Sequence, residues 1–110
     1  MRKFRLTMAQ INPTVGDMEG NTAKIIQYID QARALGADLV AFPELAIPGY
    51  PPEDLVFKPQ FVRDNRRCME KVVVASEGIA VVVGFVDAND GIYTAAAVAY
   101  NGDLVSIYHK

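Results

Sequence analysis

The sequence predicts an α/β fold with a mixed sheet, in which a βαβα segment is followed by a three-stranded β-meander. Up to Gly78, short apolar runs alternate with two longer segments that have the apolar periodicity of amphipathic helices. After Gly78, two glycine-containing turn signals separate three strand-like runs. A chain of 110 residues is long enough for one small domain, so residues 1–110 are expected to belong to a single domain.

The first half of the chain is expected to form a strand, a helix and a second strand. Phe4–Ala9 is apolar on both faces, as a buried strand would be. Asp17 is placed to cap a helix with an apolar stripe, and Gly36 is a natural end for that helix. The short apolar run Asp38–Phe42 then predicts a second strand, which Pro43 ends.

The second half begins with a proline-rich loop and continues with a helix and the meander. Residues 47–59 contain four of the six prolines, which permits only a loop with one helical turn near Glu53–Phe57. A second helix is expected over Gln60–Glu77, with Gly78 directly after its end. Three strands follow, joined by tight turns at Asn89–Gly91 and Asn101–Gly102: Ile79–Val86, Tyr93–Tyr100 and Asp103–Lys110.

The strand expected over Ile79–Val86 has no polar face, so both of its faces need to be covered. Two helices can cover one face of the sheet, and the other face would need a second layer. The sequence also ends at His109 and Lys110, in a strand-like run without the polar residues at which termini usually fray. We therefore expect residues 1–110 to be the front part of a longer protein.

Composition and charge exclude several classes of function. The formal net charge is -2, and acidic residues interrupt the densest basic stretch, so neither a nucleic-acid nor a membrane partner is expected. One cysteine and one histidine are too few for a disulfide framework or a zinc site, so no metal is expected. The longest apolar run, Ile79–Val86, is far shorter than the ~20 residues of a membrane span, which indicates a cytoplasmic protein. The basic stretch is interpreted as a solvated helix face: Arg63, Arg66, Arg67 and Lys71.

A single carboxylate stands where chemistry is expected in such a fold. Glu44 directly follows the strand Asp38–Phe42, and ligands bind at the carboxyl ends of strands in open α/β sheets. Its neighbours are apolar, so we expect partial burial, which suits a general acid or base that works near neutral pH. The alternative is that Glu44 caps a turn or pairs with a surface lysine.

The segment around this glutamate resembles a known family motif. Ala41–Tyr50 (AFPELAIPGY) is similar to the glutamate motif of the nitrilase, or carbon–nitrogen hydrolase, superfamily. Its extension Pro51–Leu55 resembles one branch of that superfamily, the amino-terminal glutaminase domains of glutamine-dependent NAD synthetases. Met8–Asp17, Gly20–Asn21 and Tyr108–Lys110 fit the same superfamily, so the resemblance runs along nearly the whole chain.

The resemblance implies that the chain is part of a nitrilase-type αββα sandwich with a Glu-Lys-Cys catalytic triad. The family's glutamate matches Glu44, a general base, and its lysine matches Lys110, which would stabilise the tetrahedral intermediate. Tyr50 matches a tyrosine that helps to line the glutamine pocket. The family's nucleophilic cysteine lies well beyond the lysine in sequence. Cys68 precedes the lysine, on the apolar stripe of the second helix, and is interpreted as a core residue.

The same resemblance implies that the full-length protein hydrolyses the side-chain amide of L-glutamine. The ammonia would pass to a separate synthetase domain, where ATP and magnesium support amidation of nicotinic acid adenine dinucleotide to NAD. The expected partners are therefore the remainder of the glutaminase domain and the synthetase domain, in a homo-oligomer. No cofactor is expected on residues 1–110, which alone should be inactive because the matched triad lacks its cysteine.

Two other functions remain open at this point. One is the front part of a stand-alone nitrilase or amidase, and the other is a non-catalytic α/β binding module. The Pro51–Leu55 run favours the glutaminase over the amidase. A 110-residue protein that is monodisperse and unfolds cooperatively would favour the binding module, because half of a sandwich exposes a sheet face.

The remaining polar residues are expected to have structural roles. His109 is the only histidine, and strand alternation turns it away from the face to which Lys110 points. Two acidic residues are expected in a solvated loop and three others in turns and helix caps: Glu53 and Asp54, and Asn12, Asp17 and Asn21.

Overall fold

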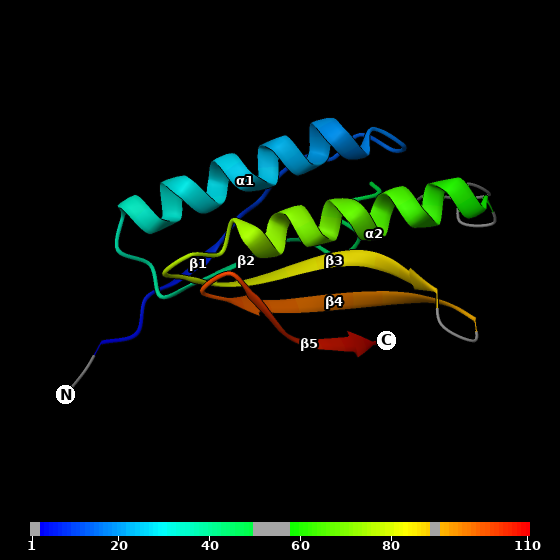
Figure 1. The fold of residues 1–110 in the computed structure, drawn as a ribbon. Helices are drawn as coiled ribbons and strands as arrows, with labels where there is room; N and C mark the ends of the chain where they lie inside the picture. Colours follow the sequence, from blue (N-terminus) through cyan, green and yellow to red (C-terminus); the bar gives the residue numbers. More distant parts are fainter. Residues whose placement is uncertain (1–2, 50–57, 89–90) are drawn as a thin grey trace.

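The computed structural model describes residues 3–49, 58–88 and 91–110, whose helices and strands lie in two layers (Figure 1). The order of elements is βαβα followed by three strands, as the sequence predicts. Their bounds are β1 (Leu6–Met8), α1 (Met18–Ala34), β2 (Leu39–Ala41), α2 (Pro59–Val74), β3 (Ala80–Ala88), β4 (Ile92–Tyr100) and β5 (Asp103–His109).

The five strands form one mixed sheet with the order β1-β2-β3-β4-β5. β1 pairs with β2, and β2 with β3, in parallel, because a helix crosses over between the strands of each pair. β3, β4 and β5 pair in antiparallel fashion, because only a few residues connect each of these strands to the next. This arrangement confirms the predicted mixed sheet.

Both helices pack side by side on one face of the sheet, and the core lies between them and the strands (Figure 1). Among the residues that the structure describes, no helix lies on the other face. Neither α1 nor α2 combines the length and the apolar character that a membrane span needs. The largest fully buried side chains of this core include Ile25, Ile29, Val40, Met69, Val72, Val81, Val83 and Phe85.

The ends of α1 follow the sequence signals. Asp17 is the N-cap residue, and its carboxylate accepts a hydrogen bond of 3.1 Å from the backbone N–H of Gly20. Beyond the last residue of α1, Gly36 adopts a φ of 79°, a conformation that glycine reaches without steric cost. The strand that follows is shorter than expected, since only Leu39–Ala41 pairs with its neighbours.

α2 ends at Val74, earlier than the predicted Glu77. The segment directly after the helix makes a tertiary contact that the local sequence does not reveal. The backbone carbonyl of Ser76 accepts a 2.9 Å hydrogen bond from the N–H of Asn101, and its hydroxyl accepts one of 3.0 Å from the N–H of Gly102. The turn between β4 and β5 therefore anchors the segment that follows α2.

A β-bulge interrupts the pairing of β4 with β5. Val98 pairs with Ser106, but Ala99 pairs with Leu104, so Val105 has no direct partner in β4. Beyond the bulge, the pairing continues without interruption to the end of β5.

Candidate functional site

Glu44 lies in the loop that follows β2, at the carboxyl end of a parallel strand. Hydrogen bonds to β3 hold this loop. The N–H of Phe42 donates to the carbonyl of Val82 at 2.9 Å, and the N–H of Ile47 donates to the carbonyl of Gly84 at 3.2 Å. The loop is thus anchored to β3 on both sides of Glu44.

The contact at Gly84 leaves no room for a side chain. A Cβ atom there would lie 2.4 Å from the backbone nitrogen of Leu45 and 3.0 Å from the carbonyl oxygen of Pro43. Leu45 itself has a φ of 54°, in the left-handed region that residues with a branched side chain rarely adopt. Strained backbone of this kind is held in place by its surroundings and is concentrated at functional sites.

Lys110 follows β5 directly, and its backbone N–H donates a 2.9 Å hydrogen bond to the carbonyl of Thr94. This bond extends the pairing of β4 with β5 by one residue. The side chain of Lys110 points to the side of the sheet that the described helices leave open, where Val82 and Tyr108 also lie.

The structure brings Glu44 and Lys110 together across 66 positions of sequence. The Nζ atom of Lys110 lies 3.3 Å from each carboxylate oxygen of Glu44. A carboxylate and an ammonium group at this distance provide a proton acceptor beside a fixed positive charge. That pair can serve a reaction in which a proton is removed while negative charge develops on a neighbouring oxygen.

The two side chains border two hollows that share the wall formed by Pro43. One hollow has a volume of about 260 Å³, and it lies over the sheet at Gly84. The other has a volume of about 390 Å³, and Asn12 and Pro13 also line it. Across residues 3–49, 58–88 and 91–110, no three His, Cys, Asp or Glu side chains are grouped as metal ligands would be.

The expected burial of Glu44 is not found. Its side chain is 49% exposed, and that of Lys110 is 70% exposed. The physical reason is that the described part of the chain places no second layer over this side of the sheet. Exposed ion pairs contribute only ~0–1 kcal/mol to stability, so the pair alone does not hold its own geometry.

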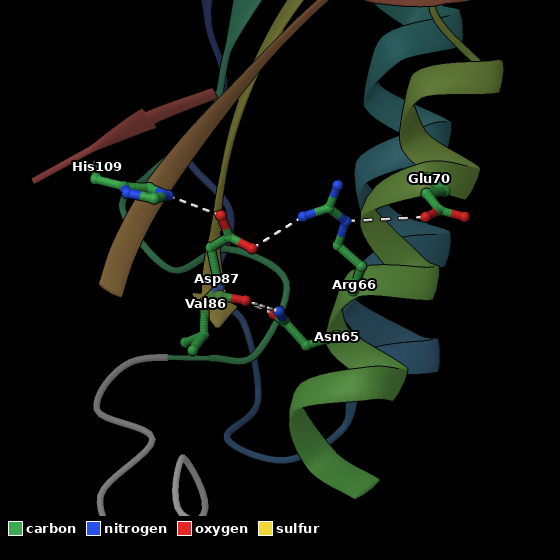
Figure 2. A network of polar contacts seen from close by, with 6 residues as sticks. All are labelled: Asn65, Arg66, Glu70, Val86, Asp87 and His109. Atoms are coloured by element: carbon green, nitrogen blue, oxygen red, sulfur yellow. Dashed lines mark hydrogen bonds and ion pairs between the residues drawn. The ribbon is translucent and has the colours of Figure 1, made fainter. Parts of the chain in front are cut away.

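His109 points to the opposite face of β5, as strand alternation predicts. Figure 2 shows its imidazole beside the carboxylate of Asp87, with 2.7 Å between Nε2 and Oδ2. The other oxygen of Asp87 accepts a hydrogen bond of 2.9 Å from Nη1 of Arg66, on α2. The imidazole also stacks on the ring of Tyr93, with centroids 4.4 Å apart and planes inclined by 4°.

Arg66 and Asp87 are residues of this network that the sequence analysis missed. The interpretation of Arg66 as part of a solvated helix face is incomplete: its side chain is 43% exposed, but its guanidinium binds a carboxylate that is 7% exposed. On its other side, Nε of Arg66 lies 3.8 Å from a carboxylate oxygen of Glu70. One signal could have identified Asp87: it is the only charged residue in the otherwise apolar strand β3.

Cys68 is a core residue, as predicted. It is 1% exposed and belongs to the same apolar cluster as Phe61 and Val72. Its Sγ atom lies 4.0 Å from a carboxylate oxygen of Glu19, on the helix layer. It is not among the residues that line the hollows at Glu44.

Asn21 has a larger role than the turn or cap that its sequence position predicts. It is 1% exposed, and its Nδ2 donates to the carbonyls of Thr14 and Ile47 at 2.8 and 2.9 Å. Its Oδ1 accepts a 2.8 Å hydrogen bond from the N–H of Thr14. One buried amide thus ties the segment before α1 to the loop that carries Glu44. The pattern Gly20–Asn21 was the only sequence signal for it.

Several sequence predictions lie outside the described residues. They are the pocket residue Tyr50, the helical turn near Glu53–Phe57 with Glu53 and Asp54, and the turn residues Asn89 and Asp90.

Comparison with known proteins identifies the family. The profile of the carbon-nitrogen hydrolase family matches residues 5–110. The glutamine-dependent NAD(+) synthetase of Thermotoga maritima is 44% identical over 112 aligned residues, which cover 100% of this chain and 19% of that protein. The chain therefore spans about one fifth of the length of that relative.

Solved structures agree with this result. The crystal structure of a glutamine-dependent NAD(+) synthetase from Cytophaga hutchinsonii superposes with a TM-score of 0.91 at 25% identity, over 94% of this chain and 18% of that one. An amidase from Nesterenkonia sp. superposes with a TM-score of 0.82 at 23% identity, over 97% of this chain and 42% of that one, which shows a shared fold. The match over nearly the whole sequence, on a sheet that brings Glu44 and Lys110 together, means that the chain belongs to the carbon–nitrogen hydrolase family.

Proposed function

We propose that the protein containing this chain hydrolyses the side-chain amide of L-glutamine and delivers the ammonia for ATP-dependent amidation of nicotinic acid adenine dinucleotide to NAD. The proposal is carried by the 3.3 Å contact of Glu44 with Lys110 in a chain 44% identical throughout to an NAD synthetase. Residues 1–110 would supply the front part of the glutaminase domain. A separate synthetase domain would bind ATP and magnesium, in a cytoplasmic homo-oligomer.

In this proposal, Glu44 and Lys110 act on a cysteine nucleophile and its substrate. The carboxylate of Glu44 takes the proton of the thiol, and the thiolate attacks the amide carbon of glutamine. The carbonyl π electrons move to the oxygen, and the ammonium of Lys110 stabilises the resulting negative charge. When the C–N bond breaks, the proton held by Glu44 goes to the leaving nitrogen, which departs as ammonia. Water, activated by Glu44, then hydrolyses the thioester and releases glutamate.

The cysteine in this scheme comes from outside the 110 residues. The sequence contains one cysteine, Cys68, which is buried in the core and absent from the hollows at Glu44. A 110-residue polypeptide of this sequence should therefore release no ammonia from glutamine. Tyr50, by its match to the family motif, would line the glutamine pocket.

Glutamine is favoured over a simpler amide by the degree of similarity. The Thermotoga maritima and Aquifex aeolicus NAD synthetases are 44% and 38% identical over nearly all of this chain. The amidase from Nesterenkonia sp. is 23% identical, and this match shows a similar fold.

The test is to replace Glu44 with glutamine in the full-length protein. Glutamine keeps the size of the side chain but cannot accept the thiol proton, so glutamine-driven NAD synthesis should fall at least about 100-fold. Synthesis from added ammonium should stay at the wild-type rate, because it bypasses the amide hydrolysis. Both rates are measured as NAD formed with saturating ATP.

Cys68→Ala is the matched control and should leave both rates unchanged. Loss of the ammonium-driven rate in Glu44→Gln would assign Glu44 to folding. An unchanged glutamine-driven rate in that variant would remove it from the reaction. A full-length protein that forms NAD from neither nitrogen source would favour the binding module.

A further inference from the structure

We propose that Asp87 and His109 are positioning residues for Lys110. They hold the end of β5 so that the ammonium group of Lys110 meets the carboxylate of Glu44. The proposal rests on the proposed glutaminase function, in which Lys110 stabilises the tetrahedral intermediate.

Lys110 lacks packing of its own. Its side chain is 70% exposed, and its partner in the ion pair, Glu44, is 49% exposed. β5 lies at the edge of the sheet and pairs only with β4 among the described strands. The backbone at Lys110 is held by one hydrogen bond, from its N–H to the carbonyl of Thr94. An exposed lysine has considerable rotamer freedom, so its direction must be set by what fixes its backbone.

His109 provides that fixation from the other side of the strand. Its Nε2 lies 2.7 Å from Oδ2 of Asp87, and its ring stacks on Tyr93 with centroids 4.4 Å apart. Successive residues of a strand point to opposite faces, so a bond that orients His109 also orients Lys110. The hydrogen bond and the stacking act together on the last residue of β5.

Asp87 is itself held from two other elements. It belongs to β3, and the residue as a whole is 5% exposed. Its second carboxylate oxygen accepts the hydrogen bond from Arg66 on α2. Because a buried carboxylate without partners is costly, its two hydrogen bonds fix its position strongly. The neighbouring residue Val86 bonds to the side chain of Asn65 through both its N–H and its carbonyl, as Figure 2 shows. The carboxylate of Asp87 therefore fixes the edge strand β5 relative to the core.

The same strand positions both members of the pair. β3 anchors the Glu44 loop through the carbonyl of Gly84, and it anchors β5 through the carboxylate of Asp87. These two anchor points are three residues apart on one strand. The 3.3 Å contact between Glu44 and Lys110 thus depends on two short connections to a single rigid element.

The experiment uses three substitutions at His109 in the full-length protein. His109→Ala removes both the hydrogen bond and the stacking, His109→Phe keeps only the stacking, and His109→Gln keeps a donor near the position of Nε2. We expect kcat for glutamine hydrolysis to fall about 10- to 100-fold in the Ala and Phe variants, because small displacements of a catalytic group cost this much. His109→Gln should recover most of the loss. KM for glutamine should change less than about twofold, because His109 lies on the opposite face of β5 from Lys110 and Glu44.

Asp87→Asn tests the other partner and should lower kcat in the same way. Arg67→Ala is the matched control, since Arg67 lies next to Arg66 on α2 but binds Asp64 on the surface. It should leave kcat and KM unchanged. In every variant the ammonium-driven rate should equal that of the wild type.

Other outcomes would refute either the positioning role of Asp87 and His109 or the roles of Glu44 and Lys110. An unchanged kcat in His109→Ala and Asp87→Asn would overturn the positioning role, as would a loss that His109→Gln does not recover. A rise in KM without a fall in kcat would also overturn it. If Lys110→Ala and Glu44→Gln retain glutamine hydrolysis, the roles given to these two residues fail independently of His109. A wild-type protein that does not hydrolyse glutamine would refute the proposed function itself.

Discussion

The position of Glu44 depends on Gly84, which has no side chain. The loop after β2 approaches Gly84 so closely that the backbone nitrogen of Leu45 occupies the space of a Cβ atom. The positive φ of Leu45 is the local cost of that approach. A glycine in a strand often marks such a close backbone contact, and here the contact serves the loop that presents the carboxylate.

Gly84→Ala should therefore damage the site more than the fold. The added methyl group would displace the Glu44 loop by more than half an ångström, and misplacements of about 1 Å can lower a catalytic rate about 100-fold. We expect glutamine-driven NAD synthesis in the full-length protein to fall by that factor, with the ammonium-driven rate unchanged. Equal loss of both rates would mean that Gly84 is needed for folding instead.

At the scale of elements, the sequence predicted which segments form strands and helices and in which order. Apolar periodicity and turn residues are local, so they were sufficient for β1 to β5 and both helices. The early end of α2 was not predicted, and neither was the contact of Ser76 with the turn at Asn101 and Gly102. Contacts between segments distant in sequence have no local signal.

The same limit applied to the site. Glu44 was predicted from its position after a strand and Lys110 only from the resemblance to a family, and nothing in their spacing of 66 positions indicated contact. The network of Arg66, Asp87 and His109 joins α2, β3 and β5, and no motif spans those three elements. The expected burial of Glu44 failed because it was argued from sequence neighbours, whereas burial depends on the layer above.

The contact of α2 with β3 gives a prediction at this scale. Arg66→Ala leaves Asp87 with one partner, which should cost about 1 kcal/mol, whereas Arg67→Ala removes only a surface ion pair and should cost about 0.3 kcal/mol. Hydrogen exchange of the full-length protein can measure this locally. Amides of α2 and of the end of β5 should exchange about fivefold faster in Arg66→Ala, since 1.4 kcal/mol corresponds to tenfold. Equal effects of the two substitutions would contradict a special role for Arg66.

At the scale of the whole molecule, the sheet has one covered and one open face in the described chain (Figure 1). Large apolar side chains on the open side are strongly exposed, among them Leu6 at 56%, Met8 at 77% and Tyr108 at 69%. Soluble proteins rarely leave such a surface uncovered, because contact with water is unfavourable for it. The second layer predicted from the apolar strand Ile79–Val86 would cover it.

A 110-residue polypeptide of this sequence should therefore self-associate. We expect oligomers whose size grows with concentration in sedimentation velocity, together with binding of a hydrophobic dye. Met8→Lys should reduce both signals, because it places a charge on the open face. Val74→Lys is the control on α2, where the replaced side chain is 72% exposed on a different surface. A monodisperse monomer without dye binding would contradict the expectation.

The β-bulge in β5 has a consequence for how this strand can change during evolution. Paired residues of neighbouring strands point to the same face, and the unpaired Val105 shifts the pairing by one position. Deletion of Val105 would remove the bulge and leave His109 opposite Ala95, so at this position β5 can lose a residue without exchanging the faces of His109 and Lys110. Beyond the bulge, deletion of one paired residue from a strand held in this register would exchange those two faces. A change in length is therefore absorbed at the bulge, whereas between Ser106 and Lys110 it would turn the side chain of Lys110 toward the face that the helices cover.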